Sequence, residues 1–159
     1  MSYAKKSLKS HVHGLSVAQV YVEVEGPSES FLGFEHRPKT AKEKASWKNI
    51  QSIWKNKSGD LFSVKDMSCS FEKKRIALVF EEDDHGKEKH HDEDKKTAEH
   101  SEIKAEMYIV CEKMVSGPVL NVSLNKGLLR TGEVEAHVLL QNGKFYKKDI
   151  EKGTGSLKL

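Results

Sequence analysis

A strongly charged segment divides this chain and limits what the rest can fold into. Residues 81–102 read EEDDHGKEKHHDEDKKTAEHSE, with ten Asp or Glu, four Lys and four His. They offer almost nothing apolar, so burial cannot offset the entropy of ordering them, and we expect a mobile His/acid-rich insertion. At 159 residues the chain suits one domain spanning 1–159, or two small halves that share a core.

The runs on either side of the insertion alternate apolar and polar residues. Residues 69–80 place Ile76, Leu78 and Phe80 on one face, and residues 103–111 alternate in the same way. Because a period of two is typical of half-buried strands, the runs predict a hairpin. The charged segment would be its long tip, where added residues are tolerated.

The remaining chain predicts more strands than helices. Thr40 and Glu43 form a capping box before a run with helical spacing, which predicts an amphipathic helix through residue 56. Asn142-Gly143 is a strong hairpin signal. The other strand-like runs are residues 11–25, 119–124, 134–140, 145–150 and 157–159. We therefore expect an α+β, mainly antiparallel β domain with sandwich-like sheets and one clear helix.

The two cysteines are far apart in the sequence. Cys69 and Cys111 form no CxxC pair, which argues against a zinc ribbon and favours one disulfide. Such a bond would close a loop of about 40 residues, contribute about 3 to 4 kcal/mol, and hold the two ends of the charged segment together. The alternative is two unpaired buried thiols in a cytosolic protein.

Six histidines are candidate metal ligands. His11 and His13 are two residues apart, so on a strand both imidazoles would project from one face and converge on one ion. Four more histidines lie among carboxylates in the charged segment and offer the mixed nitrogen and oxygen donors that suit zinc. These four are His85, His90, His91 and His100. The alternatives are a polar strand edge for the first pair and a solvated acidic loop for the other four.

Two further histidines are not expected to be ligands. His36 precedes Pro38 beside apolar residues, which favours a hydrogen-bonded structural role. His137 shares a strand face with Glu135 and Leu139, where a surface role, or support of a metal ligand, is the better interpretation.

Several of these motifs resemble one family in order along nearly the whole chain. The chain resembles the ZrgA-like family of bacterial periplasmic zinc-binding proteins in four motifs. These are HVHG, GFEHRPKT before the helix, EHSEIKAEMYIVCEK after the charged segment, and the terminal SLKL. The resemblance implies Zn(II), a periplasmic location and an accessory role in supplying zinc to a high-affinity transporter. It also implies that the two cysteines pair and that the six histidines above are ligands. Family loops are dense in His-Asp repeats, whereas this segment mixes four histidines with four lysines, which lowers the expected zinc-buffering capacity.

Other functions have less support in the sequence. G-x-S-x-G, HExxH and a phosphate loop are absent, so we do not expect an enzyme. The basic remainder of the chain, near +9, lacks interleaved aromatics, which argues against nucleic-acid binding. The first ten residues lack the apolar centre of a signal peptide and no run suits a membrane span, so we expect a cytosolic protein or a mature form with a replaced start. The alternative function is a non-catalytic interaction module whose acidic loop docks a basic partner.

Overall fold

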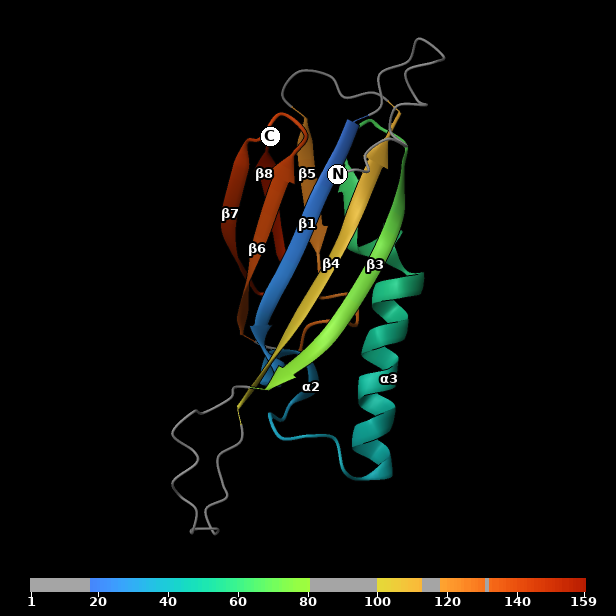
Figure 1. Ribbon diagram of the computed structural model, residues 1–159, viewed down its shortest axis with the longest axis vertical. Helices are drawn as coiled ribbons and strands as arrows, with labels where there is room; N and C mark the ends of the chain where they lie inside the picture. Colours follow the sequence, from blue (N-terminus) through green and yellow to red (C-terminus); the bar gives the residue numbers. More distant parts are fainter. Residues whose placement is uncertain (1–17, 81–99, 113–117, 131) are drawn as a thin grey trace.

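The computed structural model describes residues 18–80, 100–112, 118–130 and 132–159. Within these ranges the chain forms a five-stranded sheet of order β3-β4-β1-β6-β7 and a three-stranded sheet of order β2-β5-β8 (Figure 1). Every strand pairing is antiparallel. The predicted α+β, mainly antiparallel β class is confirmed.

The strands of the two sheets are interleaved along the chain, and the helices lie between the first two strands. The strands of the larger sheet are β1 (Ala18–Pro27), β3 (Cys69–Phe80), β4 (Ser101–Cys111), β6 (Glu133–Leu140) and β7 (Phe145–Glu151). Those of the smaller sheet are β2 (Phe62–Val64), β5 (Val119–Ser123) and β8 (Thr154–Lys158). The helices are α2 (Ser28–Leu32), α3 (Ala41–Asn56) and α4 (Ser58–Leu61). Residues 11–17, which we expected to begin the first strand, lie outside the described residues.

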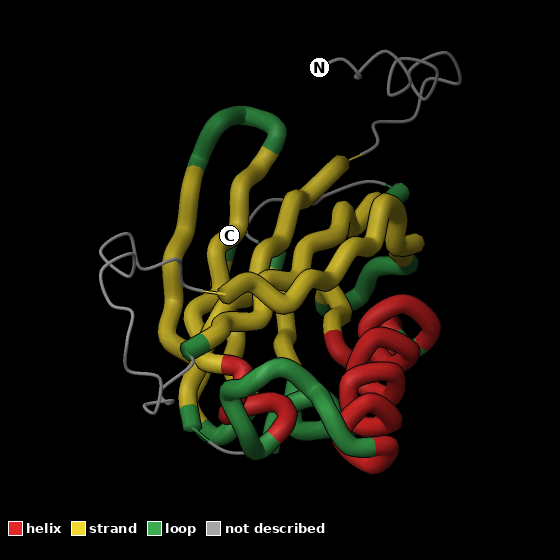
Figure 2. Tube along the Cα trace, turned by 60° about the horizontal axis from the view of Figure 1, so that its bottom comes forward, coloured by secondary structure: helices red, strands yellow, loops and turns green. Residues whose placement is uncertain are grey.

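One hydrophobic core joins the two sheets and the long helix. Alternate residues of β1, represented by Val20, Val22 and Val24, are fully buried, as the period-two pattern predicted. They share a cluster with Leu120 of β5 and Trp54 of α3. The three-stranded sheet and α3 therefore cover one face of the five-stranded sheet (Figures 1 and 2). Its other face is left to carry polar side chains.

The predicted capping box begins the long helix. The side chain of Thr40 accepts a hydrogen bond from the Glu43 backbone N–H at 3.0 Å, and Glu43 Oε1 accepts from the Thr40 N–H at 3.2 Å. The expectation of one clear helix missed α2 and α4. Each has five residues or fewer, which is too short for helical spacing to show in a sequence.

The β3–β4 hairpin and its disulfide form as predicted, but the disulfide lies at the other end of the hairpin. Cys69 is bonded to Cys111 and pairs with it in register, whereas Phe80 pairs with Ser101 beside the charged segment. The expectation that the cysteines hold the ends of that segment together is wrong. One cysteine begins β3 and the other ends β4, so about ten strand residues separate the bond from the tip. The last two residues of the predicted insertion, 101 and 102, belong to β4.

Candidate metal centre

Of the six histidines predicted to bind metal, one lies in the described part of the chain. His100 directly precedes β4. The other five lie outside the described residues: His11, His13, His85, His90 and His91.

His100 is held by a carboxylate. Its Nδ1 lies 2.7 Å from Glu35 Oε1, and 65% of the His100 side chain is exposed. The backbone of Glu35 is fixed in turn, because Ser101 Oγ donates to its carbonyl oxygen at 2.6 Å. A pocket of about 390 Å³ lies beside this contact and is also lined by Glu102. A histidine with one ring nitrogen on a carboxylate has the arrangement common among metal-binding histidines, and here that arrangement rests on the ordered end of a strand.

His36 has the structural role that its position predicted. Its Nε2 lies 2.9 Å from Glu43 Oε2, and its ring stacks on Phe34 with centroids 4.8 Å apart. Glu43 accepts hydrogen bonds from the backbone of Lys39, from His36 and from the backbone of Thr40, and these lower its pKa to about 2. This histidine ties the segment before α3 to the first turn of the helix.

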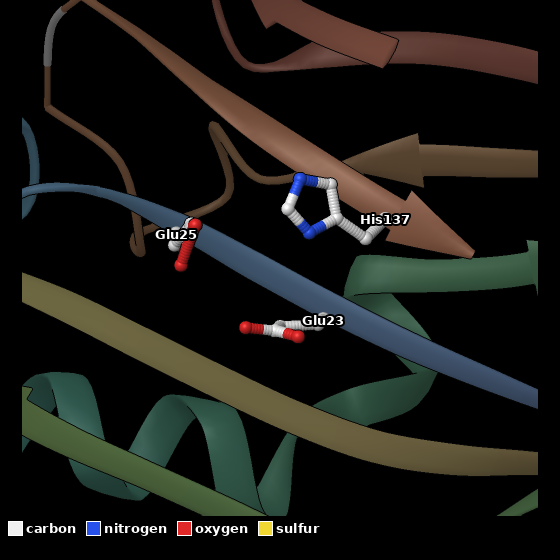
Figure 3. A group of neighbouring side chains, drawn as sticks. All are labelled: Glu23, Glu25 and His137. Atoms are coloured by element: carbon white, nitrogen blue, oxygen red, sulfur yellow. The ribbon is translucent and has the colours of Figure 1, made fainter. Parts of the chain in front are cut away.

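A group of donor atoms meets on the outer face of the five-stranded sheet. Glu23, Glu25 and His137 each offer one ligand atom, and these three atoms lie within 4.8 Å of one another. Glu23 and Glu25 alternate on β1, and the register places His137 of β6 opposite Glu23. Figure 3 shows the imidazole of His137 with one ring nitrogen turned toward β1 and the two carboxylates. All three side chains are largely covered, with exposed fractions of 19% for Glu23, 25% for Glu25 and 20% for His137.

Neighbouring side chains position and balance this group. Glu135 Oε1 lies 3.1 Å from His137 Nε2, and the Phe145 ring lies 5.9 Å from the imidazole, centroid to centroid. The hydrogen bond from His137, followed by the charge of Lys147, lowers the pKa of Glu135. On the other side, Lys104 of β4 places its ammonium 3.9 Å from Glu23 and 3.7 Å from Glu25.

Glu106 lies next to the group but has its own partners. The Tyr21 hydroxyl donates a short hydrogen bond to Glu106, and Arg75 lies 3.6 Å from the same carboxylate. Burial, followed by the hydrogen bond to Glu106, raises the pKa of the Tyr21 hydroxyl far above its ordinary value. Tyr21 therefore stays protonated and keeps donating.

Sequence reasoning missed this group. His137 was expected to be a surface group or a supporting one, and Glu23 and Glu25 drew no attention. The available signal was an E-x-E run on one strand and an E-x-H run on another, each with both side chains on one face. What joins them is the pairing of β1 with β6, which neither run specifies alone.

Comparison with known protein families matches residues 10–159 to the family described as ZrgA family zinc uptake protein. The chain belongs to the ZrgA family. The match covers nearly the whole chain and includes all six predicted histidines, the disulfide and the group on the sheet. Comparison with curated proteins finds no match.

Membership in the ZrgA family gives the chain a role in zinc uptake. The family is a zinc uptake family and not a catalytic one, which fits the expectation of a protein that is not an enzyme. In the described part of the chain, no helix has the length and apolar character needed to cross a membrane.

Proposed function

We propose that this ZrgA-family protein binds Zn(II) in the periplasm and passes it to a component of a high-affinity zinc transporter. The observation that carries the proposal is the family match, which spans every histidine predicted to bind zinc. The proposed ligands are those predicted from the sequence: His11, His13, His85, His90, His91 and His100.

The surroundings of His100 support its part in this proposal. Neutral imidazole binds zinc through one ring nitrogen while the other is held by a hydrogen bond, often to a carboxylate. The Nδ1 contact with Glu35 supplies such a bond at 2.7 Å. His100 also directly follows residues 81–99, so an ion gathered there would meet a ligand fixed to the sheet.

The disulfide supports the proposed compartment. Disulfides persist in oxidising environments such as the periplasm and are rare in the cytosol. Cys69 and Cys111 are bonded, and Cys111 is fully buried. A structural bond of this kind fits a protein that acts outside the cytosol.

Zinc titration tests the proposal. Isothermal titration of the full chain should show stoichiometric zinc binding at micromolar metal. Replacing His11 and His13 together, or His100 alone, by Ala should lower the stoichiometry or the affinity. His36→Gln is the matched control, because His36 contacts Glu43 and should affect stability without affecting zinc. A wild-type chain that takes up no zinc would contradict the proposal and favour an acidic loop that docks a basic protein.

A further inference from the structure

The outer face of the five-stranded sheet gathers ligand atoms that the proposed histidine sites do not use. Glu23 and Glu25 project from the central strand β1, and His137 projects from its neighbour β6 (Figure 3). One ligand atom from each residue lies within 4.8 Å of those from the other two. We propose that Glu23, Glu25 and His137 form a separate Zn(II) site, which relies on the proposed function only for the identity of the ion.

The imidazole distinguishes this group from an ordinary acidic surface. Its Nε2 lies 3.1 Å from Glu135 Oε1, and a bond to a carboxylate there makes Nε2 the protonated nitrogen. The lone pair then sits on Nδ1, as zinc requires. Metal-binding histidines generally have this carboxylate partner, which orients the ring and raises its basicity. Glu135 is thus a positioning residue for the site.

The donor set fits zinc better than calcium or magnesium. One imidazole nitrogen with two carboxylates is a set of nitrogen and oxygen donors that zinc accepts, whereas calcium and magnesium prefer oxygen ligands throughout. Bond lengths of about 2.0–2.2 Å place tetrahedral ligands roughly 3.4 Å apart, so the carboxylates must close by at most about 1.5 Å. Rotation of Glu23 and Glu25 side chains can supply this movement on an unchanged backbone.

Lys104 supplies the charge that an ion would replace. Two largely covered carboxylates within 4.8 Å of each other repel, and the Lys104 ammonium lies between 3.7 and 3.9 Å from them. These distances are longer than a good charge-assisted hydrogen bond, and 49% of the Lys104 side chain is exposed, so the ammonium can leave at low cost. A zinc ion that enters the site displaces the Lys104 ammonium, and the return of the ammonium favours release of the ion.

A site of this kind suits exchange more than storage. Three protein ligands leave a fourth position open to water or to an acceptor's ligand. The register pairs Glu25 with Lys104, which is four residues along β4 from His100, or about 13 Å. The site therefore lies on the sheet within a short distance of His100.

The test separates this site from the histidine ligands proposed above. In the full-length six-histidine variant, Asn replaces all six of those ligands: His11, His13, His85, His90, His91 and His100. Competition of ZnCl₂ against a fluorescent chelator should then show one remaining zinc per chain. Adding His137→Gln, or Glu23→Gln with Glu25→Gln, should weaken this binding by more than the roughly 100-fold that loss of a supporting group can cost.

Two further variants serve as a matched control and as a test for a gain in zinc affinity. Glu133→Gln is the matched control, since Glu133 lies on the same strand and face as His137 and is exposed, and the affinity should stay within twofold. Lys104→Met should tighten binding by about fivefold, a gain that misfolding cannot produce. Thermal melting without metal checks that each variant folds.

The outcomes are distinct. A folded six-histidine variant that holds no zinc overturns the sheet site and leaves the proposed function standing. A six-histidine variant that binds as much zinc as the wild type supports the sheet site and overturns the histidine ligands. If His137→Gln leaves the affinity of the six-histidine variant within twofold, the imidazole is not a ligand and the proposed site is wrong.

Discussion

Removing the Cys69–Cys111 disulfide should destabilise the protein without changing how much zinc it binds. The bond joins residues 42 apart in the sequence, so its loss frees a long loop in the unfolded chain. Loop-closure entropy for about 42 residues corresponds to about 4 kcal/mol at 25 °C. In a chain of this size each kcal/mol changes the melting temperature by about 2–4 °C, so we expect a decrease of about 8–16 °C.

The assay is thermal unfolding followed by circular dichroism, with a metal chelator present. Wild-type protein with and without a phosphine reductant is compared with the Cys69→Ala/Cys111→Ala variant, which also reveals any packing lost at the buried Cys111. Zinc stoichiometry, measured by titration of the same proteins without the chelator, should not differ among them, because Glu23 of the sheet site pairs with Glu106, five residues or about 17 Å along β4 from the disulfide. A decrease below about 3 °C would refute the entropy argument. A change in stoichiometry would show that the bond shapes a zinc site after all.

Two other predictions concern the long helix. Glu43→Gln should reduce the free energy of unfolding at neutral pH, because the native interactions that lower the pKa of Glu43 to about 2 favour its charged form. The difference from wild type should shrink as pH falls from about 4.5 to about 2, since protonation of Glu43 removes the wild-type advantage. Urea unfolding at stepped pH measures this difference, and a difference that stays constant would contradict the prediction. Trp54→Phe should cost about 1–3 kcal/mol, because the buried indole N–H donates to the Glu106 carbonyl at 3.1 Å; denaturant unfolding measures the loss, and an unchanged midpoint would show that the bond contributes little.

Local patterns in the sequence predicted most of the strands and the long helix. Alternation in residues 103–111 correctly placed five consecutive odd-numbered side chains in the core, because the period of two is a property of the strand itself. Thr40 and Glu43 marked the start of α3 for the same reason, since a capping box acts within one turn. Asn142-Gly143 joined β6 to β7 through a turn that has Gly143 at φ 94°.

Features that depend on which strands are neighbours could not be predicted in this way. Glu23 and Glu25 meet His137 because β6 pairs with β1 across more than a hundred residues of sequence. No periodicity within either strand specifies that pairing. Residue type alone favoured a metal site in the charged segment, where histidines are dense, over one on a strand with a single histidine.

The disulfide shows a different kind of error. Its pairing was favoured correctly from two strand cysteines, but its place in the hairpin was misjudged. The predicted strands already put Cys69 at the start of one run and Cys111 at the end of the next. In an antiparallel hairpin these positions lie opposite the tip, so the pattern itself contained the correct answer.

The most direct test of zinc binding is anomalous scattering at the zinc absorption edge from a crystal soaked in zinc. We predict one peak about 2.0–2.2 Å from the donor atoms of Glu23, Glu25 and His137, and at least one more at His100 or another proposed histidine. A well-ordered, zinc-soaked crystal with no peak at either group would contradict the account.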